Sequence, residues 1–245
     1  MAEVLRNKDF DVAGVQVDRD GPVVGCVAAE ALRDGLVRDH QRALMVDELI
    51  SDATPLPNVL SVLKVREHTF VLIGSAVRGI ITRADLNKPP VRVYLFGLIS
   101  LLEMHLGFWI RATYRDESWE RRLSATRLAV ARELQAKRRE RNQNISLIDC
   151  LQFCDKRDLV LARNELVEKL QLGGRTGSRK FFNRAEGLRD LLAHSQQDLD
   201  EGTSWESVID LVDWIERTLL TSDDQVEEVA RGATQSGEDT LWAAV

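Results

Sequence analysis

Cysteine, histidine and lysine are all scarce in this chain of 245 residues, which has three cysteines, four histidines and seven lysines. Three cysteines are too few for a disulfide framework. Cys150 and Cys154 are about one helical turn apart, but no second pair or nearby histidine completes a zinc site, so we expect buried free thiols. The sequence also lacks a carboxylate cluster and an HExxH motif, and we expect neither a metal nor a required cofactor.

An apolar signal segment is missing too, because the N-terminal run MAEVLRNKDFD contains no apolar core. We expect a cytoplasmic protein of two domains. The net charge of −6 argues against a general nucleic-acid coat protein. The charge is uneven, however, since residues 115–141 and 156–194 are each net positive and residues 196–245 are strongly acidic. A locally basic surface is therefore expected.

Short apolar runs separated by turn residues fill the first ninety residues and predict a mixed α and β fold there. The expected elements form two similar units. The first has strands over 12–17 and 23–27 and a helix over 28–36. The second has an extended segment over 44–46, a helix over 57–64, strands over 69–73 and 77–81, and a helix that begins at 83 and ends before two prolines. The order strand, helix, strand, strand, helix appears once whole and once without its N-terminal part.

The run GIITRAD over residues 79–85 closes the second unit, and together with the internal repeat it resembles the CBS family of tandem (Bateman-type) domains. That family has a glycine, two apolar residues, Ser or Thr, two variable residues and Asp. The resemblance implies a cleft for an adenine nucleotide such as AMP or ATP, or for an S-adenosylmethionine-like ligand. Thr82 would contact phosphate and Asp85 the ribose hydroxyls, with Gly79 and Arg83 as further ligand-binding candidates.

The corresponding stretch of the first unit, residues 25–31, has alanine at the positions of the hydroxyl and the carboxylate. We therefore expect one functional cleft at most. A second interpretation of the intact copy stays open, in which Thr82 caps a helix, Asp85 stabilises its first turn and no ligand binds. The module would then serve dimerisation alone.

Residues 91–112 form a long apolar run that contains Glu103 and His105. The run is long enough to cross a membrane, but a carboxylate, an imidazole and two glycines within it are unfavourable in a bilayer. We expect no membrane contact. The run instead predicts a core helix that joins the two halves of the chain and packs against a second copy.

A helix over residues 178–196 is predicted from the spacing of Phe181, Ala185, Leu188 and Leu192. Glycines precede it, and Ser178 is the expected N-cap. Cationic groups around one imidazole suit a phosphodiester. The candidates for contact with RNA are Arg179, Lys180 and Arg184.

Near the end of this helix, Arg189, Asp190 and His194 form the run RDLLAH. Asp190 lies four residues before His194, so the two share a helix face. The run resembles the signature of the HEPN family: an arginine, a small polar or acidic residue and a histidine, on one helix of a four- or five-helix bundle. Active members are metal-independent ribonucleases whose site forms where two copies of this helix meet. By resemblance His194 transfers protons, Arg189 stabilises the phosphorane, and Glu103 is a second polar group of the site.

Structural interpretations of the same residues stay open. His194 can cap the C-terminal end of its helix, Arg189 can pair with Glu186, and Glu103 can pair with a buried arginine. The basic run over residues 137–141 is either a contact for RNA or part of the solvated face of its helix.

Further helices are expected over residues 118–139, 146–153, 155–172 and 204–220. The whole pattern predicts an α+β tandem CBS-like module over 1–90, an all-α HEPN-like bundle over 91–222 and an acidic, flexible tail over 223–245. The implied function is a nucleotide-regulated, metal-independent endoribonuclease that cleaves RNA as a homodimer or higher homo-oligomer, in a toxin or antiviral defence role. The alternative is a non-catalytic adenine-nucleotide sensor or dimerisation scaffold.

Overall fold

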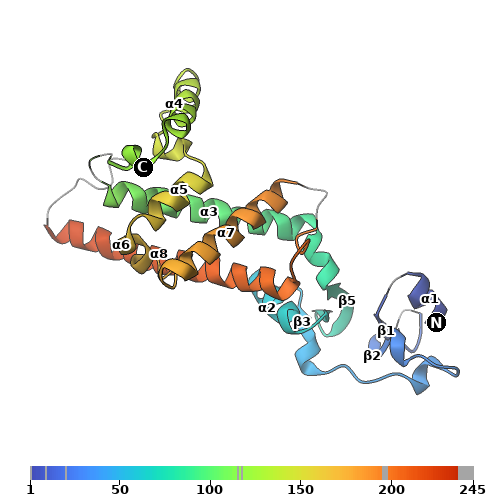
Figure 1. Ribbon diagram of the computed structural model, residues 1–245. Coiled ribbons are helices and arrows are strands. Elements are labelled where there is room, and N and C mark those ends of the chain that lie inside the picture. The colour runs from blue at the N-terminus through green and yellow to red at the C-terminus, as the bar shows by residue number, and fades with distance from the viewer. Residues whose placement is uncertain are drawn as a thin grey trace. The chain divides into compact units, whose positions relative to one another are not determined.

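A computed structural model describes residues 2–8, 10–19, 21–114, 116, 118–194 and 198–236. The chain is mixed α and β, with two small sheets followed by a helical region (Figure 1). It divides into two compact units, unit 1 over Met1–Lys88 and unit 2 over Pro89–Val245. Unit 1 ends two residues before residue 90, the position at which the pattern of short apolar runs ends in the sequence.

Unit 1 contains both sheets. After the short helix α1 (Ala2–Asn7), strands β1 (Val12–Gln16) and β2 (Val23–Ala28) form an antiparallel hairpin. The second sheet has the order β3-β4-β5, with β3 (Leu49–Ser51) parallel to β4 (His68–Ile73) and β4 antiparallel to β5 (Ala76–Thr82). Helix α2 (Leu56–Val65) is the crossover between the parallel strands. Buried Cys26, Phe70 and Val77 form a core cluster shared by β2, β4 and β5.

The second half of unit 1 has the expected element order of strand, helix, strand, strand and helical turn. Its last element, η4 (Arg83–Asn87), is a 3-10 helix rather than an α-helix. Pro89 and Pro90 lack N–H groups, so they cannot donate to the carbonyls that an α-helix here would present. The extended segment expected over 44–46 is extended at Met45 and ends where the 3-10 turn η3 (Val46–Glu48) begins, and the strand that pairs with β4 is β3.

The helix expected over residues 28–36 is wrong, since only the 3-10 turn η1 (Ala29–Ala31) forms there. Leu32 already has an extended backbone, with φ −70° and ψ 122°, so the turn ends there, and Gly35, at φ +123°, also lies outside the helical region. Leu32 turns back onto the hairpin and is buried with Leu5 and Val27 in a second core cluster.

Unit 2 is a helical bundle around α3 (Pro89–Thr113), which contacts α5 (Phe153–Leu161), α7 (Gly174–Ala193) and α8 (Trp205–Ser236). Short elements complete it: η5 (Ser118–Arg122), α4 (Ala125–Arg139), η6 (Ile148–Cys150) and α6 (Asn164–Lys169). Aromatic side chains fill the core. Phe181 of α7 lies 4.9 Å from Trp214 of α8 and 5.3 Å from Phe182, measured between ring centroids.

Among the described helices, α3 alone is long and apolar enough to span a membrane, but 44% of its most apolar stretch is buried inside the bundle. Its ionisable residues also have partners within unit 2. Lys156 of α5 donates to Glu103 at 3.1 Å, and the His105 ring lies 2.7 Å from the Ser222 hydroxyl of α8. These contacts are those of a core helix.

Several helix ends differ from those that periodicity predicts. The helix expected over 155–172 is broken into α5 and α6, and Arg163, between them, stacks on the Tyr114 ring at 4.7 Å. The helix expected over 118–139 begins as η5, and α4 starts only after Ser124, whose hydroxyl accepts from the Arg127 N–H. The last helix extends past residue 220 to Ser236, so the first part of the expected flexible tail is helical, and residues 237–245 lie outside the described chain.

Helix α7 begins four residues before the predicted start. Its N-cap is Gly173, which has φ +73°, and Ser178 is an interior residue whose hydroxyl donates to the Gly174 carbonyl at 2.7 Å. Gly177 is required within the first turn, because a Cβ there would lie 2.9 Å from the Leu172 carbonyl oxygen. The glycines therefore form the start of the helix instead of preceding it.

Candidate functional site

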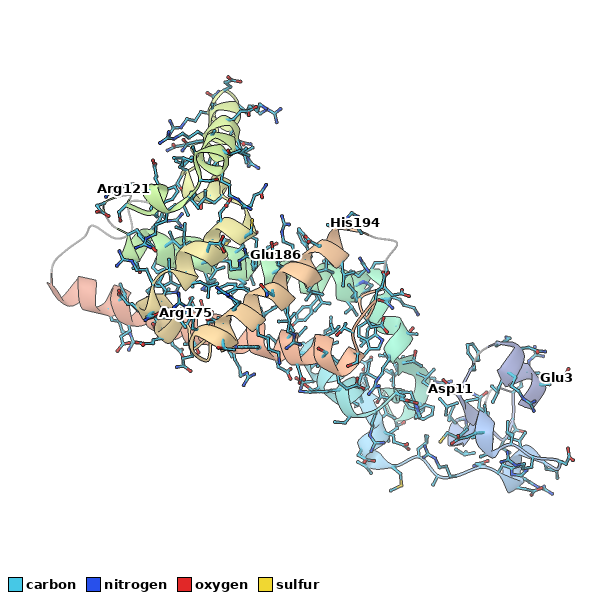
Figure 2. All side chains as sticks on the ribbon, in the orientation of Figure 1. Glu3, Asp11, Arg121, Arg175, Glu186 and His194 are labelled. Carbon is cyan, nitrogen blue, oxygen red and sulfur yellow. The ribbon has the colours of Figure 1, made fainter. Side chains whose placement is uncertain are left out.

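The motif Arg189, Asp190 and His194 lies at the exposed C-terminal end of α7. The buried face of the helix is formed by Phe181, Ala185 and Leu188, and all three motif residues are exposed. The Arg189 Nη1 lies 3.5 Å from the Asp190 Oδ1, and the side chains keep 43% and 64% of their surface. Figure 2 shows His194 at one end of α7 and Arg175 at the other. A guanidinium, a carboxylate and an imidazole are thus all exposed at this end of α7.

His194 follows the last residue of α7 and is its C-cap. The interpretation of His194 as a helix cap is correct for its backbone, because the His194 N–H donates to the Leu191 carbonyl at 3.2 Å. The ring is a separate matter. It is exposed, and the described chain contains no hydrogen bond between Asp190 and His194. Glu186, the alternative partner of Arg189, is instead paired with Arg157 of α5.

Arg92 of α3 fixes the end of α7, a role that the sequence did not indicate. Its Nη2 donates to the Leu191 carbonyl at 2.7 Å and to the His194 carbonyl at 3.0 Å. A cation at a helix C-terminus is favourable because the last carbonyls have no partner in the helix and carry partial negative charge. The available signal was an arginine within an otherwise apolar run. Arg92 thereby holds the backbone of His194 while the ring stays free.

The three basic residues proposed for RNA contact have different environments. Arg179 and Lys180 are exposed on α7, about 20 Å along the helix from His194 at 1.5 Å per residue. Arg184 is half-buried and donates to the carbonyl and the hydroxyl of Ser207 at the start of α8. Arg184 therefore joins two helices, and its guanidinium is already engaged.

Glu103 is not brought to the motif within one chain. Its carboxylate accepts from Lys156, which is buried. Along α3 it lies about 16 Å from Arg92, the residue that contacts the end of α7. The expected partner of Glu103 was an arginine, and the actual one is a lysine. In the isolated chain, Glu103 thus forms an ion pair with Lys156 inside the bundle.

The second candidate site is a cavity of about 890 Å³ in unit 1, lined by residues of β1, β4, β5 and η4. Thr82, Arg83 and Asp85 all line it, together with Lys88 and His68. The pairing of β4 with β5 sets His68 opposite Thr82, which is how a residue outside the GIITRAD run reaches the cavity. Burial lowers the pKa of His68, which favours the neutral ring.

The polar groups of this cavity already have local partners. The Asp85 carboxylate accepts from the Thr82 N–H at 2.7 Å and from Lys88 at 2.5 Å. Burial of Asp85 raises its pKa, but the hydrogen bonds from Lys88 and Thr82 outweigh burial and lower it, so the group is a carboxylate at neutral pH. Arg83 donates to the Leu63 and Lys64 carbonyls at the end of α2.

Gly79 does not line the cavity. It lies on β5 opposite Val71, and a Cβ added there would meet Val71 at 3.5 Å, an ordinary contact. Glycine is therefore not required at this position for backbone conformation or space. Of the four ligand-binding candidates, Thr82 and Asp85 have polar groups at the cavity wall, and Arg83 is bound to the end of α2.

Within the described ranges, no group of three or more His, Cys, Asp or Glu residues could hold a metal ion. The three cysteines are free, and burial raises the pKa of Cys26 and Cys150, which keeps both as thiols. Comparisons with protein-family models, curated proteins and solved structures find no match to this chain.

Proposed function

We propose that this protein is a metal-independent endoribonuclease of the HEPN type. The observation that supports the proposal best is the exposed triplet of Arg189, Asp190 and His194 at the end of α7, with the His194 backbone held by Arg92 and its ring free. Catalytic groups need a fixed main chain and an accessible side chain, whereas a purely structural histidine would use its ring nitrogens within the fold.

The proposed chemistry is attack of a ribose 2′-oxygen on the adjacent phosphorus. A neutral His194 takes the 2′-hydroxyl proton, the new P–O2′ bond forms, and the P–O5′ bond breaks as the 5′-oxygen receives a proton. The products are a 2′,3′-cyclic phosphate and a 5′-hydroxyl. Arg189 stabilises negative charge on the phosphorane, and Asp190 orients the neighbouring guanidinium of Arg189. One imidazole cannot be base and acid in the same step, so the proposed site uses a second copy of α7.

A surface on α3 supports the proposed second copy. Val93, Phe96 and Met104 keep 72%, 56% and 64% of their surface, and with Leu101 they form an apolar stripe on the side of α3 that faces away from the bundle. A standard interface buries about 800 Å² on each partner, so the stripe would form part of a larger contact. Arg92 directly precedes this stripe and contacts His194. We propose that a two-fold interface here joins the two motifs.

The proposed regulation rests on the cavity in unit 1. An adenine nucleotide or an S-adenosylmethionine-like ligand would contact Thr82 and Asp85, with Lys88 as the cation beside them. The ligand can regulate cleavage only if it binds unequally to two arrangements of the dimer. A cytoplasmic toxin or phage-defence protein is the setting that the HEPN resemblance implies.

Cleavage of mixed RNA in the presence of EDTA tests the proposed activity. We expect wild-type protein to release fragments with 2′,3′-cyclic phosphate ends and the His194→Ala variant to be slower by about 10² to 10⁴-fold. Asp190→Asn should lose less, because Asp190 acts through a neighbour. His40→Ala is the matched control and should cleave at the wild-type rate. Equal rates for wild type and His194→Ala would contradict the proposal.

The alternative function is a non-catalytic adenine-nucleotide sensor, and the cavity at Thr82 and Asp85 favours it. Calorimetry with AMP, ATP and S-adenosylmethionine on wild type and Asp85→Ala tests this site. Heat that disappears in Asp85→Ala and persists in the surface control Asp52→Ala would support it. Ligand binding without RNA cleavage would favour the sensor over the ribonuclease.

A further inference from the structure

Helix α4 carries a cluster of arginines that the proposed catalytic site does not use. Figure 1 shows α4 projecting from the rest of the helical bundle. Ala131 is its one buried residue in a helix of fifteen. Such a helix gains little from packing, which is where most helices in proteins obtain their stability. Packing against the core therefore does not account for this helix.

The cations of α4 fall into two groups. Those near its base are anchored, because Arg127 contacts Asp155 and Cys154 at 2.6 Å and Arg132 contacts Glu120 at 2.7 Å. At the tip, Lys137 is paired with Glu133 at 2.6 Å, and the arginines differ from it. Arg138, Arg139 and Arg141 are exposed, and in the described chain none has an ion-pair partner. This tip cluster is net positive in a chain whose total charge is −6.

The tip of α4 is a defined turn. The Gln143 N–H donates to the Arg138 carbonyl at 3.0 Å, and the Gln135 side chain donates to the Ile145 carbonyl at 3.0 Å. Asn142, with φ 58°, turns the chain between them. The three guanidinium groups are thus attached to an ordered main chain, which reduces the entropy lost when they bind a partner.

We infer that the tip cluster of α4, Arg138, Arg139 and Arg141, binds the phosphate backbone of RNA. The choice of RNA as the ligand of this cluster rests on the proposed ribonuclease function. A helix C-terminus favours cations by about 0.3 to 1 kcal/mol, but that effect does not need three of them without carboxylate partners on a projecting helix. Guanidinium groups match phosphate geometry and contribute affinity without sequence specificity.

Fluorescence anisotropy with labelled single-stranded RNA at several salt concentrations tests this inference. The protein carries His194→Ala so that the RNA stays intact. Replacing the three tip arginines by glutamine should weaken binding at least tenfold at low salt and lower the slope of log affinity against log salt by about 2, because each single-strand phosphate contact contributes about 0.7. The control, with the same change in charge, replaces Arg38, Arg217 and Arg231 by glutamine and should keep the slope.

A second variant with lysine at the three tip positions should keep a slope near that of the parent, which separates charge from folding. Equal slopes for the tip variant and the charge-matched control would overturn the inference. Polyglutamate that competes as well as RNA of equal charge would overturn the assignment to RNA and favour an acidic protein. Tip-dependent binding by a protein whose wild type does not cleave RNA would leave the inference standing and reject the proposed activity.

Discussion

Glu48 is a carboxylate of unit 1 with a strongly lowered pKa. It is buried, and Arg42 donates to both of its oxygens at 2.6 and 2.7 Å. These hydrogen bonds lower the pKa of Glu48 to about 2, although burial opposes the shift. The pair lies beside Cys26, whose backbone bonds to Arg42, so it joins the hairpin β1–β2 to the chain that leads to β3.

Because the folded pKa of Glu48 is depressed, its contribution to stability is fully present above the unfolded value near 4.5 and is lost as the pH falls toward 2. We predict that Glu48→Gln lowers the free energy of unfolding by about 2 kcal/mol at pH 7. The difference from wild type should narrow between pH 4.5 and pH 3. Urea titrations at several pH values measure it, and a difference independent of pH would contradict the assignment.

Residue patterns predicted local contacts better than distant ones. Thr82 and Asp85, three residues apart, line the same cavity. The helix face expected to be shared by Asp190 and His194 does not form, because α7 ends at Ala193 and His194 has an extended backbone with φ −105° and ψ 93°. Arg92 and His194 are far apart in sequence, and the hydrogen bond between them depends on how α3 packs against α7. Periodicity in either helix contains no information on that crossing. The anchoring of Arg184 to Ser207 was unpredictable for the same reason.

At the scale of elements, α7 depends on α3 for the position of its last turn. We predict that Arg92→Ala leaves the bundle folded but exposes the Leu191 and His194 carbonyls, which loosens the end of the helix. Hydrogen exchange should become faster in the last turn of α7, and cleavage should slow by about tenfold with little change in KM.

Arg92→Lys is the conservative control, because a lysine keeps the cation but can donate to fewer acceptors in fixed geometry. It should restore most of the protection from exchange. Unchanged exchange in Arg92→Ala would show that α7 holds its own end and that Arg92 has another role.

Element type was predictable where one pattern dominated. Strands β4 and β5 and helix α2 lie within one residue of their predicted ends, because apolar alternation and flanking glycines or prolines agree there. The errors arose where two patterns competed. Around Gly173 and Gly177, conformational preference indicated a break, whereas the structure uses the glycines to begin α7. Tertiary contacts with Tyr114 accompany the break between α5 and α6.

At the scale of the whole molecule, the apolar stripe on α3 predicts self-association. Replacing Phe96 and Met104 by glutamate should convert a dimer into a monomer. The two new carboxylates of each protomer would be buried against the two of its partner, and like charges repel. Sedimentation velocity measures the change. Leu220→Glu is a matched control, since Leu220 is 65% exposed on α8 outside the stripe. A wild-type monomer, or a dimer that survives the double substitution, would contradict this assignment.

The central claim is that two copies of α7 meet so that both motifs form one ribonuclease site, and cross-linking next to His194 tests it most directly. Ala193 is exposed beside His194, and Cys154 is the one cysteine that is not buried. In a Cys154→Ser background, Ala193→Cys should give a covalent dimer with a short bis-maleimide, whereas Glu228→Cys on α8 should not. Cross-linking at Glu228→Cys but not at Ala193→Cys would contradict the account.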